Sequence, residues 1–161
     1  MSKLIFDKKT TYLTTIAGLP GTRIFQKCYF LNEKGRLVDV CEGGRFSCSL
    51  MVSGVLYRFG LIKQMRVTVK SLIRDMKWSG WQEKEIDRLL PGAVLVWEPR
   101  LGADGKQHRH IGFFLGEDKC VSNDPRTRQE GGTFLPIEHT LYMEDLLGYK
   151  RKIEKAFCFK F

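Results

Sequence analysis

A cysteine between a glycine-rich loop and an apolar segment is the residue of this sequence best placed for covalent chemistry. The loop covers residues 42–45 (Glu-Gly-Gly-Arg), and Cys48 opens an apolar segment that ends at Gly60. Such a segment is typical of a buried helix with a glycine after its last turn. The unpaired N–H groups and the dipole of a helix N-terminus stabilise an anion, so we expect a lowered pKa and a nucleophilic thiolate at Cys48.

A thiolate nucleophile works with a base, and His110 is the natural candidate. It lies in a segment, 109–115 (Arg-His-Ile-Gly-Phe-Phe-Leu), that reads as a strand. A cysteine on a helix that faces a histidine on a strand is an arrangement of covalent cysteine catalysis. Two other histidines are weaker candidates. We expect His108 to be a solvated residue at the rim, and His139 could reach the cleft from a later strand.

The other cysteines indicate neither a disulfide framework nor a metal site. The chain has five cysteines, an odd number, and no Cys-x-x-Cys pair. The nearest approach to a ligand cluster is His108, His110 and Cys120, which lacks a fourth ligand. The sequence therefore predicts no metal and no cofactor, and most of these cysteines are expected to be small buried residues.

Periodicity places helices in the middle of the chain and an antiparallel sheet after them. Helices are expected over 48–59, over 69–76 with Thr68 as cap and Gly80 as stop, and over 82–90. Strands are expected over 93–98, 109–115, 119–123, 134–142 and 152–161. This order predicts an α+β fold in which residues 1–161 form a single domain. Residues 1–42 are expected to be a β-rich extension with a hairpin around the turn 32–35.

The charge of the chain is its most visible bulk property, but it does not select a partner. The sequence holds 27 Lys+Arg against 18 Asp+Glu, for a net charge of +9. The densest basic tract, 150–160, alternates with apolar residues, which is typical of a half-buried strand with a solvated basic face rather than of a nucleic-acid site. No apolar run is long enough for a membrane span, and the N-terminus lacks the apolar stretch of a signal peptide, so we expect a cytoplasmic protein.

Three blocks of sequence together resemble the NlpC family of papain-like cysteine peptidases. The run 46–49 (Phe-Ser-Cys-Ser), followed by 56–61 (Leu-Tyr-Arg-Phe-Gly-Leu), resembles the helix-start motif of that family. Residues 90–97 (Leu-Pro-Gly-Ala-Val-Leu-Val-Trp) resemble its Pro-Gly-Asp-Leu strand. Residues 110–116 (His-Ile-Gly-Phe-Phe-Leu-Gly) resemble its histidine strand. The blocks come in the family's order and together cover roughly residues 43–123.

The resemblance implies a papain-like fold, with a nucleophile helix packed against an antiparallel sheet, and a cysteine peptidase or amidase. Cys48 would be the nucleophile and His110 its base, and the substrate would be a peptidoglycan stem peptide or a related small peptide. Such a fragment would be met in recycling inside the cell, or in the wall after release by lysis or a partner. The substrate-binding residues and the oligomeric state are not indicated.

Three departures from the family pattern bear on the substrate. Ser47 replaces the aspartate that in the family is thought to hold the free amine of the substrate. Leu50 replaces a glycine, and Ala93 replaces the strand aspartate. A catalytically inactive papain-like fold that acts as a binding module is therefore the alternative, and a basic nucleic-acid-binding module is a second one.

The residue that orients His110 depends on the register of the hairpin around 117–118. In the family this position is a polar residue on the next strand, and counting straight across places it at Ser122. A two-residue turn instead places Asn123 opposite Gly112, on the face of His110, whereas a three-residue turn places Ser122 there. An amide carbonyl accepts firmly from an imidazole N–H, so we predict Asn123 as the third catalytic residue.

Overall fold

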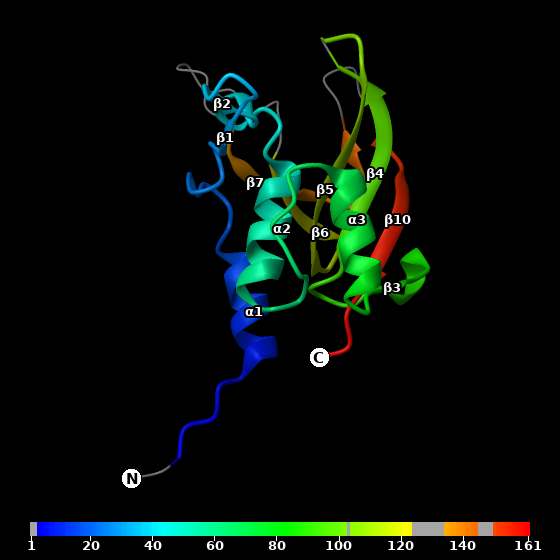
Figure 1. Ribbon diagram of the computed structural model, residues 1–161. Coiled ribbons are helices and arrows are strands. Elements are labelled where there is room, and N and C mark those ends of the chain that lie inside the picture. Colours follow the sequence, from blue (N-terminus) through cyan, green and yellow to red (C-terminus); the bar gives the residue numbers. More distant parts are fainter. Residues whose placement is uncertain (1–2, 103, 124–133, 145–149) are drawn as a thin grey trace.

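The computed structural model describes residues 3–102, 104–123, 134–144 and 150–161. In these ranges the chain forms three α-helices, a six-stranded antiparallel sheet and two small two-stranded sheets (Figure 1). The predicted α+β class is confirmed. None of the described helices is both long and apolar enough to cross a membrane.

The first helix, α1 (Lys8–Ala17), lies in the segment predicted to be β-rich. The carboxylate of Asp7 caps it by accepting from the backbone N–H of Thr10 at 2.9 Å. The threonines of this helix are β-branched and suggest a strand, but the hydroxyl of Thr15 bonds back to the carbonyl of Thr11 at 2.8 Å. Burial of Tyr12 and Ile16 in the core then fixes the helical form.

The two helices predicted in the middle of the chain form as expected. They are α2 (Cys48–Arg58) and α3 (Val69–Trp78), and the hydroxyl of Thr68 caps α3. The helix predicted over 82–90 is wrong: the strand β3 (Gln82–Glu83) and the 3-10 turn η2 (Ile86–Arg88) occupy this segment. Gln82 and Glu83 pair with Cys158 and Phe157, and the backbone N–H of Lys84 donates to the carbonyl of Ala156 at 2.9 Å, so the start of this segment is held as an extended strand.

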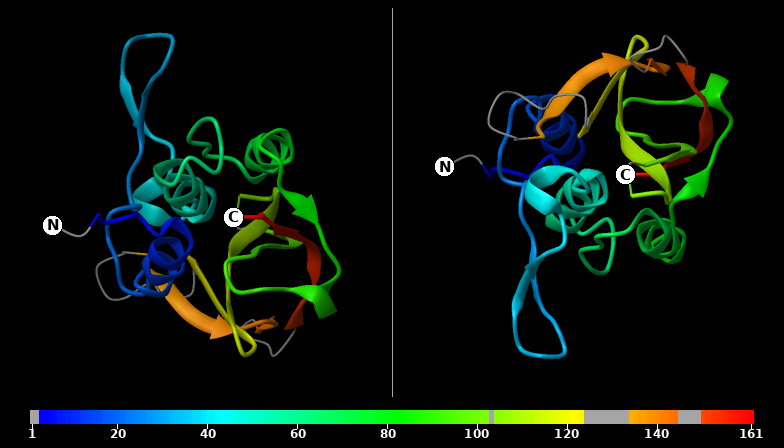
Figure 2. Two further views of the ribbon diagram at one scale, coloured as in Figure 1. Left: turned by 90° about the horizontal axis from the view of Figure 1, so that it is seen from below. Right: turned by 90° about the horizontal axis from the view of Figure 1, so that it is seen from above.

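The large sheet contains six strands in the order β3-β10-β4-β5-β6-β7. Its other members are β4 (Val94–Leu101), β5 (Gln107–Gly116), β6 (Lys119–Asn123), β7 (Pro136–Thr140) and β10 (Ile153–Cys158). The small sheets pair β1 (Tyr29–Leu31) with β2 (Leu37–Asp39), and β8 (Met143–Glu144) with β9 (Lys150–Arg151). The hairpin predicted around 32–35 is thus confirmed, and it projects from the body of the molecule (Figure 2).

Two apolar clusters lie on the two faces of the large sheet. The three helices gather on one side and all contact β5 (Figure 2). Their side chains, such as Met51, pack against Val96 and Ile111 of the sheet. On the other face, Trp97 lies with Leu95 and other residues of the second cluster. Because side chains alternate along a strand, this division assigns His110, the neighbour of Ile111, to the face of Trp97.

The register between β5 and β6 corrects one prediction. Glu117 and Asp118 do form a two-residue turn, and both have positive φ angles, 50° and 59°. A bulge between Phe114 and Gly116 nevertheless shifts the pairing by one residue. Ser122 therefore lies opposite Gly112, and the prediction that Asn123 faces His110 is wrong.

The close approach of strands at Gly112 gives a testable consequence for stability. A Cβ atom there would lie 2.5 Å from the carbonyl oxygen of Val121 and 2.7 Å from the Cβ of Ser122. Because backbone must move to admit a methyl group, we expect Gly112→Ala to lower the free energy of unfolding by about 1–3 kcal/mol. Urea denaturation measures this, and Gly18→Ala is the control, because its Cβ meets nothing nearer than 3.5 Å. Equal stability of both variants would contradict the packing described.

Candidate active site

Cys48 and His110 border the same cavity, whose volume is about 910 Å³. The walls come from the segment before α2, the start of α3, the β4–β5 hairpin and the strands β8 and β9. Its lining includes Phe46, Val69, His108 and Met143. The structure thus brings together at one cavity the two residues that sequence reasoning chose as nucleophile and base.

The thiol of Cys48 is half-buried at the first position of α2. Contrary to the sequence prediction, its pKa is raised, because burial against the apolar helix-side cluster disfavours the thiolate. The backbone N–H groups of Ile111, Ser49 and Cys48 oppose this effect, and so does the positive charge of Arg151. The helix N-terminus acts in the predicted direction, but burial outweighs it.

The position of the thiol relative to His110 follows from these contacts. The N–H of Ile111 belongs to the peptide that joins His110 to Ile111, so the sulfur lies beside the backbone of the histidine. The described pairing of β5 with β6 ends at Gly112 and Ser122, whereas β4 pairs with β5 as far as Gln107, so this peptide is paired on its β4 side and not with the described residues of β6. Within the part of the chain that the structure describes, no hydrogen bond joins the Cys48 thiol to the His110 ring.

The imidazole of His110 is 5% exposed and packs against an indole ring. His110 lies directly opposite Trp97 in β4, and their ring centroids are 5.6 Å apart. The indole N–H of Trp97 donates to the carbonyl of Leu141 at 3.0 Å, which fixes this ring in turn. The packing holds the His110 side chain on the sheet face away from α2, so the expectation that Cys48 on its helix faces the His110 side chain is wrong for this structure.

Ser122 and His139 form a hydrogen-bonded pair on the same face as His110. The hydroxyl of Ser122 lies 2.7 Å from Nε2 of His139, and Nδ1 of His139 lies 2.7 Å from the carbonyl oxygen of Thr140. A carbonyl only accepts, so Nδ1 carries the proton, and in the neutral ring Nε2 accepts from Ser122. The Trp97 ring also contacts His139, at 5.5 Å between centroids. Sequence reasoning left the role of His139 open and did not foresee this pair.

Asn123 holds the loop in front of the nucleophile. Its side-chain amide donates to the carbonyl of Gly44 at 2.6 Å, and the hydroxyl of Ser47 donates to the same oxygen at 2.9 Å. Gly44 has a φ of +106°, and a Cβ there would lie 2.9 Å from the carbonyl of Phe134. The glycine of this loop is therefore required both by its backbone conformation and by the close approach of another segment.

Asp39 organises the same loop from the end of β2. Its carboxylate accepts from the backbone N–H groups of Cys28, Cys41 and Gly43 at 2.9–3.1 Å. Burial raises the pKa of Asp39, but these three donors outweigh it and the pKa is lowered. Sequence reasoning missed this residue. An aspartate at a strand end just before a pair of glycines was the available signal.

His108 lies at the rim of the cavity, as predicted. Its ring stacks on Phe46 at a centroid distance of 5.0 Å, and Nε2 lies 2.9 Å from both carboxylate oxygens of Asp104. The carbonyl of His108 accepts from Arg151, whose Nε also donates to the carbonyl of Glu98 at 2.7 Å. Arg151 thereby binds the backbone at the irregularity of the β4–β5 pairing between Trp97 and Arg100, and it places a positive charge at the cavity. The residues around Arg151 in the sequence do not indicate this role.

The chain matches no protein-family model, and it matches none of the curated proteins. The α+β class is compatible with many functions, so chemistry must be argued from the cavity and the groups around it. These are a helix-start thiol, a buried histidine on the neighbouring strand, a hydrogen-bonded serine–histidine pair behind it and a basic rim.

Proposed function

We propose that the protein is a papain-like cysteine hydrolase, a peptidase or amidase that cleaves an amide bond. Cys48 is the nucleophile and His110 the general base. The observation that carries the proposal is the position of the Cys48 thiol, at the N-terminus of a helix, beside the backbone of His110, in the wall of a cavity. The resemblance of the cysteine, Pro-Gly and histidine blocks to the NlpC family supports the same assignment.

The reaction would proceed through a thioester. His110 takes the thiol proton, and the sulfur of Cys48 attacks the carbonyl carbon of the scissile amide. The backbone N–H of Cys48 stabilises the oxyanion that forms. The C–N bond then breaks and His110 gives its proton to the departing amine. Water, deprotonated by His110, hydrolyses the thioester, releases the acid and restores the thiol.

The raised pKa of Cys48 determines how the pair must work. A preformed thiolate is disfavoured by burial, so the proton has to leave the thiol for His110 as the substrate binds. The proposal therefore requires the His110 ring to leave its contact with Trp97 and turn toward the thiol, and catalytic hydrogen bonds often tighten only when substrate is bound.

We assign the orientation of His110 to Ser122 rather than Asn123. Ser122 is fully buried, lies opposite Gly112 and points to the face of His110. Its proton is directed to His139, so the oxygen presents lone pairs that can accept from an imidazole N–H. Peptidoglycan stem peptides or related small peptides are the substrates that the family resemblance suggests.

Selective alkylation of Cys48 tests the proposal. We expect a peptide chloromethyl ketone, which occupies the cavity as a substrate would before it reacts, to modify Cys48 at pH 7 faster than Cys28 and Cys158, which are also partly exposed. His110→Gln should slow modification of Cys48 at least about tenfold, because the base is lost. His108→Gln, at the same cavity, should leave the rate unchanged. Peptide mapping by mass spectrometry gives the rate at each cysteine.

The burial of Cys48 also favours a second candidate, a catalytically silent fold that binds a peptide. That protein would use the same cavity, but its thiol would be inert and His110 would only pack against Trp97. Alkylation of Cys48 no faster than that of Cys28 and Cys158, with no effect of His110→Gln, would favour this candidate and overturn the hydrolase.

A further inference from the structure

Among the described residues, those that line the cavity beside Cys48 are more often basic than acidic. Its described walls include six basic side chains, Arg45, Lys70, Arg100, Lys106, Arg109 and Arg151. They include two carboxylates, Glu42 and Asp104. Charges of one sign around a low-dielectric hollow focus the field and raise the local concentration of ligands of the opposite sign.

Both carboxylates already have partners among the protein's own side chains. Glu42 pairs with Arg45 at 3.5 Å, and Asp104 contacts the His108 ring at 2.9 Å. Hydrogen bonds from the His108 ring and the Lys106 backbone lower the pKa of Asp104, so it remains ionised but engaged. Neither group is poised to receive a cationic part of a ligand.

Several of the cations are placed to act on a ligand near the thiol. Arg151 acts on Cys48 itself, since its charge favours the thiolate. Lys70 on α3 and Lys106 in the β4–β5 hairpin are exposed at the cavity, and no ion pair to either is found among the described residues. Arg109, in contrast, is occupied by Glu154, with two bonds of 2.7 and 3.0 Å.

The position next to the nucleophile carries no negative charge. Ser47 is 1% exposed, and its hydroxyl is committed to the carbonyl of Gly44. The remaining walls, with Phe46, Val67, Val69 and Leu101, offer apolar contact.

We infer that this cavity selects acyl or peptide substrates that carry a carboxylate or another anionic group. The inference rests on the proposed function for the reaction, but the preference for anions is a property of the cavity alone. Apolar walls contact the body of the substrate, and Lys70, Lys106 and Arg151 attract its anionic end.

Two alkylating reagents of nearly equal size test this preference directly. Iodoacetate is anionic and iodoacetamide is neutral, and both transfer a small group to sulfur with loss of iodide. The rate ratio of iodoacetate to iodoacetamide at Cys48 should exceed the ratio at Cys28 and Cys158 in the same sample at least about tenfold. The excess should shrink as salt is added from low ionic strength.

Matched charge variants separate the cavity from the whole molecule. The double variant Lys70→Gln/Lys106→Gln should lower the excess ratio at Cys48 several-fold. Lys9→Gln/Lys84→Gln removes the same net charge from positions outside the cavity walls and should leave the ratio unchanged. Equal ratios at all three cysteines, or equal effects of the two double variants, would overturn the inference.

The outcomes also separate this inference from the hydrolase proposal. If Cys48 is modified selectively in the test of the hydrolase but shows no preference for iodoacetate, the anionic substrate is rejected and the hydrolase is kept. If Cys48 is not modified selectively but prefers iodoacetate, the hydrolase is rejected and the preference of the cavity for anions is kept. If neither reagent reaches Cys48, NMR titration decides. Backbone amides of residues 104–110 should shift and saturate with N-acetylglutamate and not with N-acetylglutamine, and no shift with either overturns the inference.

Discussion

Replacement of Cys48 by alanine is expected to abolish turnover, with a loss of about a thousandfold or more in kcat/KM. The thiol is the group that forms and breaks the covalent bond to the acyl carbon, and alanine cannot replace it. The measurement is hydrolysis of a panel of N-acetylated acidic dipeptide amides, with free amine released as the signal. The fold should persist, because the side chain is half-buried and its removal leaves only a small void.

The matched control for this experiment is Cys28→Ala. Cys28 is also partly exposed, but it lies beside the β1–β2 hairpin and does not line the cavity. It should retain the wild-type rate. Full activity of Cys48→Ala on a substrate that the wild type cleaves would reject Cys48 as nucleophile, and equal losses in both variants would point to damage to the fold.

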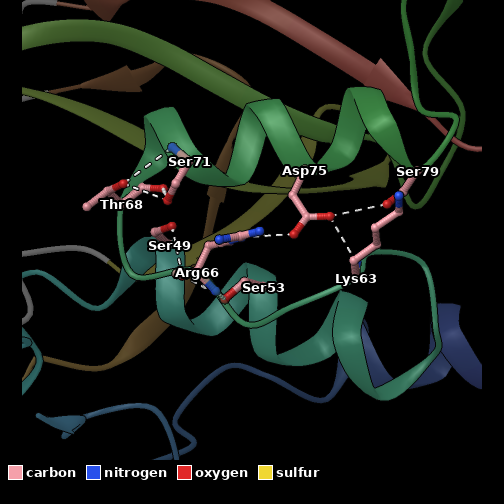
Figure 3. Close-up of polar contacts among 8 residues, drawn as sticks. All are labelled: Ser49, Ser53, Lys63, Arg66, Thr68, Ser71, Asp75 and Ser79. Atoms are coloured by element: carbon pink, nitrogen blue, oxygen red, sulfur yellow. Dashed lines mark hydrogen bonds and ion pairs between the residues drawn. The ribbon is translucent and has the colours of Figure 1, made fainter.

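Replacement of Asp75 by alanine is expected to cause the largest loss of stability, about 3 kcal/mol in the free energy of unfolding. Asp75 is fully buried in α3 and accepts from Arg66 at 2.8 Å, from the Lys63 backbone at 2.9 Å and from Ser79 at 3.2 Å (Figure 3). Alanine leaves these donors without their acceptor. Urea denaturation measures the change.

The same network ties the site to α3. The carbonyl of Arg66 accepts from the hydroxyls of Ser49 and Ser53, at 3.2 and 2.7 Å, so α2 is clamped one residue after the nucleophile (Figure 3). Asp87→Ala, at an exposed position, is the control and should change stability by less than about 0.5 kcal/mol. A loss at Asp75 no larger than that at Asp87 would contradict the role of the network.

The stabilisation by Asp75 depends on pH in a defined direction. Burial raises the pKa of Asp75, but the Lys63 N–H and the Arg66 guanidinium outweigh it, and the pKa falls below its ordinary value of 3.8. As the pH falls, Asp75 is therefore protonated in the unfolded chain before it is protonated in the folded protein. Its contribution to the free energy of unfolding is complete above pH 3.8 and is lost as the pH falls through the lower pKa of the folded state. The difference in stability between wild type and Asp75→Ala should shrink in that range.

Local signals predicted the elements whose stability is local. Thr68 caps α3, and the apolar run after Cys48 forms α2, because caps and apolar faces act within a few residues. The helix predicted over 82–90 does not form because residues 82–84 pair with β10, far away in the chain. The prediction that Asn123 faces His110 failed because one bulge shifts the pairing of β5 with β6 by one residue, and such a shift exchanges the two faces of the strand. No turn residue in the sequence indicates that bulge.

The same distinction applies to the site. Cys48 and His110 could be chosen as candidates because residue type and neighbouring sequence single them out, and the structure places both at one cavity. The raised pKa of the thiol was missed because it reflects the apolar residues that surround it in space. Arg151 acts through backbone carbonyls of distant segments, and such contacts leave no periodicity to detect. Asp39 binds backbone N–H groups that lie mostly close to it in sequence, and its place before a pair of glycines could have indicated it.

The strand order of the large sheet has a consequence for the time at which the cavity is completed. The strands β4 to β7 pair with neighbours in sequence, but β10 lies between β3 and β4. A nascent chain can therefore form the helix with Cys48 and the hairpin with His110 before it can close the sheet. Arg151 joins the cavity only after residues 150–158 have been synthesised, so a partly made chain carries the thiol without the positive charge that favours its thiolate.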